Sequence, residues 1–215
     1  LGITLIVVTV IFAILFFKIE KGKEGAFIDF KLFNNLTFTG ATISNFMING
    51  TAGMLIVSLA LLQVGGNLTA KAAGMLTLGY AISIVLFIRV GEKLLQRFGA
   101  RKPMIWGSLI VGGSIILLMF TNVMTDTYKI LCIISYTLFG LGLAFYATPS
   151  TDAALSNLPE AQAGSGSGIY KMASSLGAAF GVAISAGVFS TLRVGDNITW
   201  MEGVLTFVGR QDNVA

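Results

Sequence analysis

The chain has 215 residues, of which 55% are hydrophobic types and only 11% are charged, and it carries 26 glycines and a net charge of +4. Soluble domains have about 25% charged residues, so this composition excludes a soluble enzyme, a disordered segment and a nucleic-acid-binding module. It predicts an integral membrane protein whose first partner is the lipid bilayer. The absence of His excludes His-based metal sites and catalytic triads, and we expect neither an enzyme activity nor a metal or cofactor.

Six apolar runs approach the length of about 20 residues that a membrane-spanning helix needs. Because the runs are continuous, they do not fit the alternating ten-residue strands of a membrane barrel. A helix also satisfies its own backbone groups in lipid. The sequence therefore predicts an all-α integral membrane protein with six transmembrane helices. In chain order the runs are 1–17, 38–63, 72–88, 104–121, 130–147 and 168–190.

These runs divide the chain into four regions. Residues 1–17 form the first helix, which begins inside an apolar run without a Met start, so we expect a fragment of a longer protein. Residues 18–37 form a loop, in which 27–37 mixes apolar and polar residues as an interfacial segment or a plain amphipathic connector does. Residues 38–190 contain the other five helices. Residues 191–215 are charged and hold no further long apolar run, which predicts an atypical tail that does not cross the membrane.

Basic residues are divided unequally between the two sides that alternating loops define. One side has Lys71, Lys129 and, after the last span, Arg193 and Arg210. The positive-inside rule places the richer side in the cytoplasm. We therefore expect a multi-pass protein of the plasma membrane with its basic loops cytoplasmic. The nine basic residues of the richer side are Lys18, Lys21, Lys23, Lys31, Arg89, Lys93, Arg97, Arg101 and Lys102.

The basic segment 89–103 joins two spans by a short turn and resembles a known signature. It is similar to G-x-L-a-D-R-x-G-R-[RK] of the major facilitator superfamily, which occurs between the second and third helices of each six-helix half. The sequence departs from it at Gln96, which replaces Asp, at Ala100, which replaces Arg, and at Gly91, which comes one position early. The resemblance implies a switch that favours one end state of a rocking transporter. Its residues are Gly91, Leu94, Gln96, Arg97, Gly99, Arg101 and Lys102.

Four further runs, 28–33, 39–46, 146–153 and 168–177, resemble the fourteen-span drug/proton antiporters of the same superfamily, as in Gram-positive quinolone and multidrug efflux pumps. The resemblance covers about residues 1–192. It implies a partial major-facilitator fold, in which 1–17 is the second central linker helix and 38–190 supplies the first five helices of the C-terminal bundle. The N-terminal bundle is then a missing partner, and small-molecule drugs and protons are the transported species.

Polar and aromatic residues within the spans are candidates for a substrate cavity. Asn45 and Asn49 share one face of their helix, where they either join two helices or line a drug cavity. Tyr80 and Tyr146 either pack or bind flat cationic drugs by cation–π attraction, and Tyr170 is a further cavity or coupling candidate. The Gly177-x-x-x-Gly181 pattern predicts close helix packing. That packing lies either within the bundle or at a sliding contact between two halves.

Lys171 is the one basic residue inside a predicted span, and an ionisable residue in the membrane indicates function. Because it lies a few residues from the predicted helix end, it either anchors at the interface, with Asp152 as its partner, or couples transport. No predicted span contains an acidic residue, so the carboxylates that bind protons are expected in the N-terminal part. The leading hypothesis is a fragment of a proton-driven multidrug exporter. The alternative is a self-contained six-span homo-oligomer that acts as a channel or structural subunit.

Overall fold

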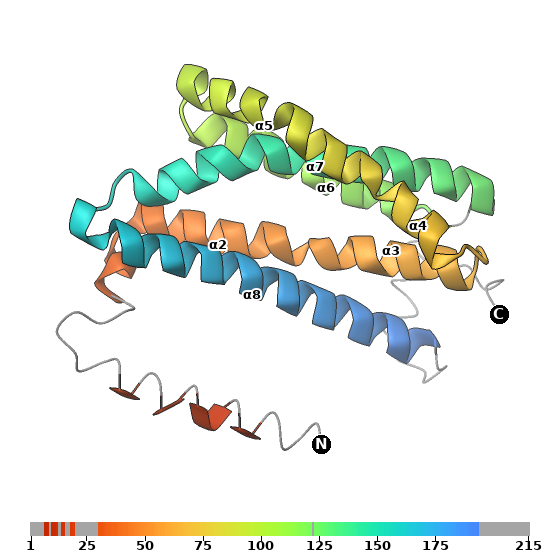
Figure 1. The fold of residues 1–215 in the computed structure, drawn as a ribbon, viewed down its shortest axis with the longest axis horizontal. Coiled ribbons are helices and arrows are strands. Elements are labelled where there is room, and N and C mark those ends of the chain that lie inside the picture. The colour runs from red at the N-terminus through yellow and green to blue at the C-terminus, as the bar shows by residue number, and fades with distance from the viewer. Residues whose placement is uncertain are drawn as a thin grey trace.

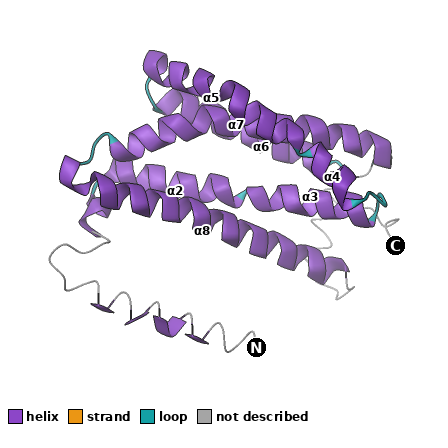
Figure 2. Ribbon diagram, in the orientation of Figure 1, coloured by secondary structure: helices purple, strands orange, loops and turns teal. Residues whose placement is uncertain are grey.

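The computed structural model describes residues 30–121 and 123–193, together with helical residues 7, 8, 10–12, 14, 15, 18 and 19. Most of the predicted first helix, most of the loop up to residue 29 and the tail after residue 193 lie outside the described residues. Within the described part every element is helical and no strand occurs, as Figure 2 shows. The predicted all-α fold is therefore confirmed.

Eight helical segments follow one another from residue 30 onward, and short turns connect them (Figure 1). Five of the continuous stretches they form are long and apolar enough to cross a membrane. They correspond to the second to sixth predicted spans. The segments are the 3-10 helix η1 (Phe30–Asn34) and the α-helices α2 (Leu36–Gly50), α3 (Ala52–Val64), α4 (Ala70–Leu76), α5 (Leu78–Phe98), α6 (Arg101–Leu118), α7 (Thr125–Leu155) and α8 (Glu160–Arg193).

Two predicted spans consist of two helices each, and a threonine stands at each break. Thr51 separates α2 from α3, and its hydroxyl donates to the Ile48 carbonyl at 2.6 Å. Thr77 separates α4 from α5, and its hydroxyl donates to the Gly74 carbonyl at 2.7 Å. A threonine hydroxyl that bonds back to the preceding turn competes with the backbone ladder. The breaks are local features of otherwise apolar spans.

Helix α2 begins at a side-chain cap. The Asn35 side-chain oxygen accepts from the N–H groups of Thr37 and Phe38 at 3.0 and 3.2 Å, which caps the first turn of α2. Before this cap, η1 places Leu32 in an apolar cluster with Phe38 and Tyr170. The described part of the predicted interfacial segment thus packs on the bundle.

Helix α7 lies at the centre of the bundle and packs most extensively on α5 and α6 (Figure 1). In the most apolar 18-residue part of α7, 44% of the residues are buried. The corresponding share is 11% for the α4–α5 stretch and 6% for α8. Helix α8 packs on α2 and α3 instead. The two least covered spans are therefore those that leave most apolar surface for lipid or for other helices.

Glycines allow the closest of these contacts. A Cβ at Gly140 of α7 would overlap the Tyr80 carbonyl of α5, and a Cβ at Gly142 would lie 2.8 Å from the Gly107 carbonyl of α6. Gly177 and Gly181 of α8 lie against the backbone of α2 in the same way. Small residues let membrane helices approach at backbone distance. Of the two alternatives for Gly177 and Gly181, the structure shows packing within the bundle.

Candidate functional site

The basic segment that was predicted as a loop is mostly helical. Helix α5 continues to Phe98 and α6 begins at Arg101, so only Gly99 and Ala100 connect them. Gly99 has φ of +72°, a conformation that favours glycine, and it ends α5 as a tight turn requires. Four residues predicted for the switch loop are therefore helical residues of α5, namely Gly91, Leu94, Gln96 and Arg97.

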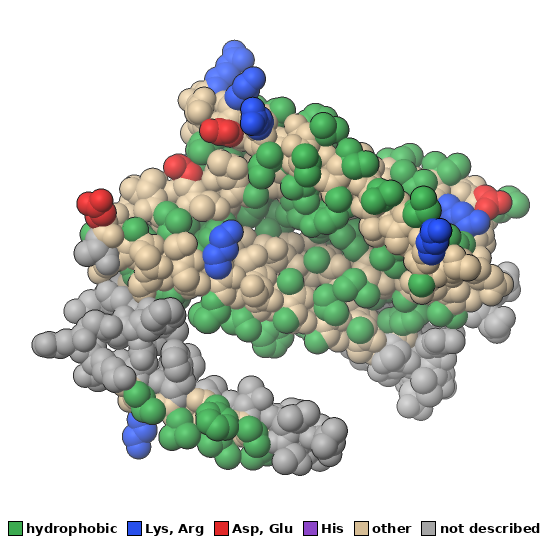
Figure 3. Space-filling model, viewed as in Figure 1, with side chains coloured by type: hydrophobic (Ala, Val, Ile, Leu, Met, Phe, Trp, Pro, Cys, Tyr) green, Lys and Arg blue, Asp and Glu red, His purple; other side chains and the backbone are tan. Residues whose placement is uncertain are grey.

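Gly91 does not take part in the turn. It is buried in α5, and a Cβ there would overlap the Ala144 carbonyl of α7. Gly91 therefore makes a contact between α5 and α7, and it lies one position earlier than the glycine of the signature. Arg97, Arg101 and Lys102 lie exposed around the turn, and Figure 3 shows basic side chains gathered at this end of α5.

An aromatic pair accompanies these cations. Phe98 and Trp106 meet edge to face with their ring centroids 5.4 Å apart. The Arg97 guanidinium lies 5.3 Å and the Lys102 ammonium 5.6 Å from the Phe98 centroid, which is within cation–π range. Cations beside half-exposed aromatic rings are typical of the boundary between membrane and water.

Asn45 and Asn49 form a hydrogen-bonded unit between two helices. The buried Asn45 amide donates to the Tyr170 carbonyl of α8 at 3.1 Å. The half-buried Asn49 amide donates to the Asn45 carbonyl at 2.8 Å and to its side-chain oxygen at 2.9 Å. Asn45 therefore joins α2 to α8, which was the first of the two alternatives. Lining a cavity remains a prediction for Asn49.

Two tyrosines extend this unit to α7. The buried Tyr146 hydroxyl donates to the Ser44 hydroxyl of α2 at 2.7 Å, and the buried Tyr170 hydroxyl donates to the Ser150 hydroxyl of α7 at 2.7 Å. The structure thus brings Asn45, Tyr146 and Tyr170 together at the junction of three helices. Sequence reasoning did not identify their partners Ser44 and Ser150, although a hydroxyl within an apolar span was the available signal.

Tyr80 lies further along the bundle. It is half-buried, its ring centroid is 5.9 Å from that of Phe139, and it packs on the cluster that includes Phe139 and Tyr146. Another polar contact that the sequence did not reveal lies nearby, since the hydroxyls of Ser58 in α3 and Tyr136 in α7 are 2.7 Å apart and buried. These aromatic side chains therefore build the inside of the bundle.

Lys171 and Asp152 are not paired in the structure. Both side chains are exposed, and the one salt bridge among the described residues joins Lys129 to Asp126 at 2.8 Å. The predicted pair fails because Asp152 belongs to α7, near its end, whereas Lys171 lies eleven residues inside α8. The sequence had placed Lys171 only a few residues from the helix end.

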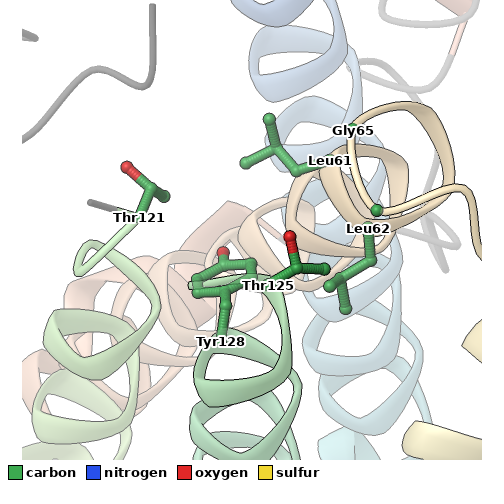
Figure 4. A pocket seen from close by; sticks show the side chains of 7 residues that line it. Leu61, Leu62, Gly65, Thr121, Thr125 and Tyr128 are labelled. Atoms are coloured by element: carbon green, nitrogen blue, oxygen red, sulfur yellow. The ribbon is translucent and has the colours of Figure 1, made fainter. Parts of the chain in front are cut away.

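A small cavity lies between the end of α3 and the start of α7 (Figure 4). Its volume is about 20 Å³, which suits a water molecule and is far below the roughly 300 Å³ of the smallest drug pockets. The Tyr128 hydroxyl at its edge donates to the Leu118 carbonyl at 3.1 Å. A drug site is therefore not expected here. The cavity is lined by Leu61, Leu62, Gly65, Gly66, Thr121, Thr125 and Tyr128.

The structure is an apolar helical bundle with a basic turn between the second and third of its described spans. The family model described as Major Facilitator Superfamily matches residues 1–182. The chain therefore belongs to the major facilitator superfamily, whose members are transporters and not enzymes, and it is a partial major-facilitator fold.

The similar proteins with curated names come from Staphylococcus aureus. The Quinolone resistance protein NorB of strain MRSA252 is 46% identical over 220 residues, which cover 97% of this chain and 47% of that protein. The protein of the same name in strain MSSA476 gives the same identity and coverage. The chain thus spans about half the length of these relatives. The similarity also extends beyond residue 192, where the motif-based resemblance ended.

Proposed function

We propose that this chain forms the C-terminal helix bundle of a secondary transporter that exports quinolones and other amphiphilic drugs in exchange for protons. The 46% identity over nearly the whole chain to quinolone resistance proteins carries this proposal. Transporters of this architecture work by rocking two bundles around a site near the membrane midplane. In this arrangement a second bundle covers part of the exposed faces of α5 and α8.

The exposed surfaces support a second bundle. Eight large apolar side chains of α5 and α8 are between 44% and 73% exposed. Lipid can cover such apolar surface as well as protein can. Because few residues of these two helices are buried in the described bundle, each has room for further helices on at least one face. The side chains are Leu78, Ile82, Val85, Leu86, Met172, Leu176, Phe180 and Ile184.

Proton binding is assigned to carboxylates outside the described helices of this bundle. The described carboxylates, Glu92, Asp126, Asp152 and Glu160, lie in the terminal turns of their helices or near them. Asp126 is also engaged by Lys129. A carboxylate that exchanges protons with a drug is expected near the midplane site, which is why the proposal needs the opposite bundle.

An assembled transporter tests the proposal. The segment of the NorB relative that matches this chain is replaced by residues 1–215, and drug efflux is measured in cells of a quinolone-sensitive host. We expect export of a quinolone and of ethidium that stops when the proton gradient is collapsed. The control is the relative with the segment deleted. Export that persists without a proton gradient would contradict proton exchange, and no export at normal membrane expression would contradict the proposal as a whole.

A further inference from the structure

We propose that the basic turn between α5 and α6 binds the headgroup of an anionic phospholipid, whose acyl chains lie along the outer face of α6. This binding is independent of the proposed drug export, because it requires only that the helices cross a membrane. Three features of the turn support it, namely its charge, the aromatic contacts of its cations and the face of α6 that continues from it.

The segment around the turn has a strong local excess of positive charge. Residues 89–103 contain five basic side chains and a single carboxylate, that of Glu92. The net charge of this segment is +4, which equals the formal net charge of the whole chain. Basic clusters of this size beside a membrane-spanning helix are typical of sites for anionic lipids. The turn therefore has the charge that attracts a phosphate headgroup.

Two cations from different helices converge on one aromatic ring of the turn. The Arg97 guanidinium of α5 and the Lys102 ammonium of α6 lie 5.3 and 5.6 Å from the Phe98 centroid. Trp106 meets the same ring edge to face, and it lies about 6 Å further along α6 than Lys102 at 1.5 Å per residue. Tryptophan is enriched at the headgroup level of membranes. The two cations are therefore held at the depth where lipid phosphates lie.

One face of α6 continues from Lys102 into the apolar part of the span. Residues 102, 105, 109, 112 and 116 recur at steps of three and four, and residues at this spacing share one face of a helix. The apolar side chains on it are 49%, 68% and 57% exposed at Ile105, Leu109 and Ile116. A Cβ at Gly112 would meet nothing within 4 Å. The face is about 21 Å long at 1.5 Å per residue, which matches one leaflet of a bilayer about 40–45 Å thick.

This face points away from the described bundle. Because successive helix residues differ by about 100°, Leu109 lies about 160° around α6 from Gly107, which packs on the backbone of α7. The exposed faces assigned to a second bundle belong to α5 and α8, so the outer face of α6 is left to lipid. The buried residues of α6 form the opposite face and are Pro103, Gly107, Val111, Ser114 and Leu118.

The charge of the turn determines which lipid fits. Guanidinium and ammonium groups both donate charge-assisted hydrogen bonds to phosphate oxygens. Phosphatidylglycerol carries a single negative charge on its phosphate, whereas phosphatidylcholine also carries a trimethylammonium group, which the cations repel. We therefore expect phosphatidylglycerol to be concentrated at the turn relative to phosphatidylcholine.

Quenching of Trp106 fluorescence measures which lipid is adjacent to the turn. The assembled transporter is placed in phosphatidylcholine bilayers that contain the same small fraction of phosphatidylglycerol or phosphatidylcholine with brominated acyl chains, which quench a nearby tryptophan. The Trp106 signal is the difference between the unchanged chain and Trp106→Phe. We expect phosphatidylglycerol to be selected by about 25-fold, because Arg97 and Lys102 each contribute about fivefold.

Variants of the two cations show whether their charges cause the selection. Arg97→Gln and Lys102→Gln should each lower it by about fivefold, the double variant should abolish it, and Arg97→Lys should keep it. Lys71→Gln, at an exposed lysine in the first turn of α4, is the matched control and should keep the full selection. Raising the salt concentration should weaken the selection, since salt screens exposed charges. Quenching by brominated phosphatidylcholine should be equal in all variants.

Three results would overturn the inference. The first is equal quenching by the two brominated lipids in the unchanged chain, which would mean that protein covers the turn or that no lipid is selected there. The second is selection that persists in the double variant. If brominated phosphatidylcholine quenches a variant differently, the turn has moved in it, and the salt titration of the unchanged chain decides; the third contrary result is selection that salt does not weaken. Drug export is measured separately, so a failure of either proposal leaves the other standing.

Discussion

At the crossing of α2 and α8 the two backbones approach too closely for a side chain at Gly177 or Gly181. A Cβ at Gly181 would overlap the Gly50 carbonyl, and one at Gly177 would overlap the Phe46 carbonyl. The hydrogen bond from the Asn45 side-chain amide to the Tyr170 carbonyl lies on the same side of α8. Residue-level contacts therefore determine how α8 sits on α2, since lipid supplies no hydrophobic driving force between membrane helices.

Replacing these glycines tests this contact. Gly181→Ala should lower the stability of the bundle by about 1–3 kcal/mol, because the neighbouring atoms are backbone and must shift. Gly168→Ala in the same helix has open space around its Cβ, and it should be neutral or stabilising by up to about 1 kcal/mol because alanine favours helix. The thermal unfolding midpoint in detergent measures both. Equal effects of the two substitutions would contradict the packing of α8 on α2.

At the scale of elements, α7 is the helix on which the bundle is built. Gly140 faces α5 and Gly142 faces α6, so two small positions, two residues apart, serve two neighbours. Tyr136 and Tyr146 add hydroxyl contacts to α3 and α2. The arrangement explains why α7 is the most buried of the spans.

A disulfide across α5 and α7 tests this arrangement. A Cβ at Gly79 would lie 3.6 Å from the Cβ of Thr137, within the range of about 3.5–4.5 Å that disulfides show. With the buried Cys132 changed to Ser, the pair Gly79→Cys and Thr137→Cys should form a disulfide on mild oxidation, detected by mass spectrometry of peptides. Gly74→Cys with Thr137→Cys is the control pair, and more efficient bonding of that pair would contradict the structure.

Hydropathy predicted the positions of five spans, because lipid imposes both their length and their composition. It missed the first turns of α8, since Glu160 and Gln162 are polar although the backbone bonds continue through them. This error placed Lys171 too near a helix end. The breaks at Thr51 and Thr77 were missed because a local change of the backbone within an apolar run does not alter hydropathy. The contacts of Ser44 and Ser150 depend on helix rotation, which hydropathy does not specify.

For the whole molecule, the two ends of the bundle differ in charge. Arg97, Arg101 and Lys102 lie at one end, where α5 meets α6, and Lys71 lies in the first turn of α4 at the other. We propose that the richer end is cytoplasmic. In the assembled transporter with Cys132→Ser, a membrane-impermeant thiol reagent should label Lys71→Cys in intact cells and Lys102→Cys only after permeabilisation. The opposite pattern would reverse the orientation.

We propose that this chain is one bundle of a two-bundle drug transporter. The most direct measurement compares ethidium efflux from cells with residues 1–215 alone in the membrane and from cells with the assembled transporter, at equal expression. We expect export from the assembled transporter and none above the empty vector from the chain alone, because one bundle cannot alternate access to a midplane site. Export by the chain alone would contradict this account and favour a self-contained homo-oligomer.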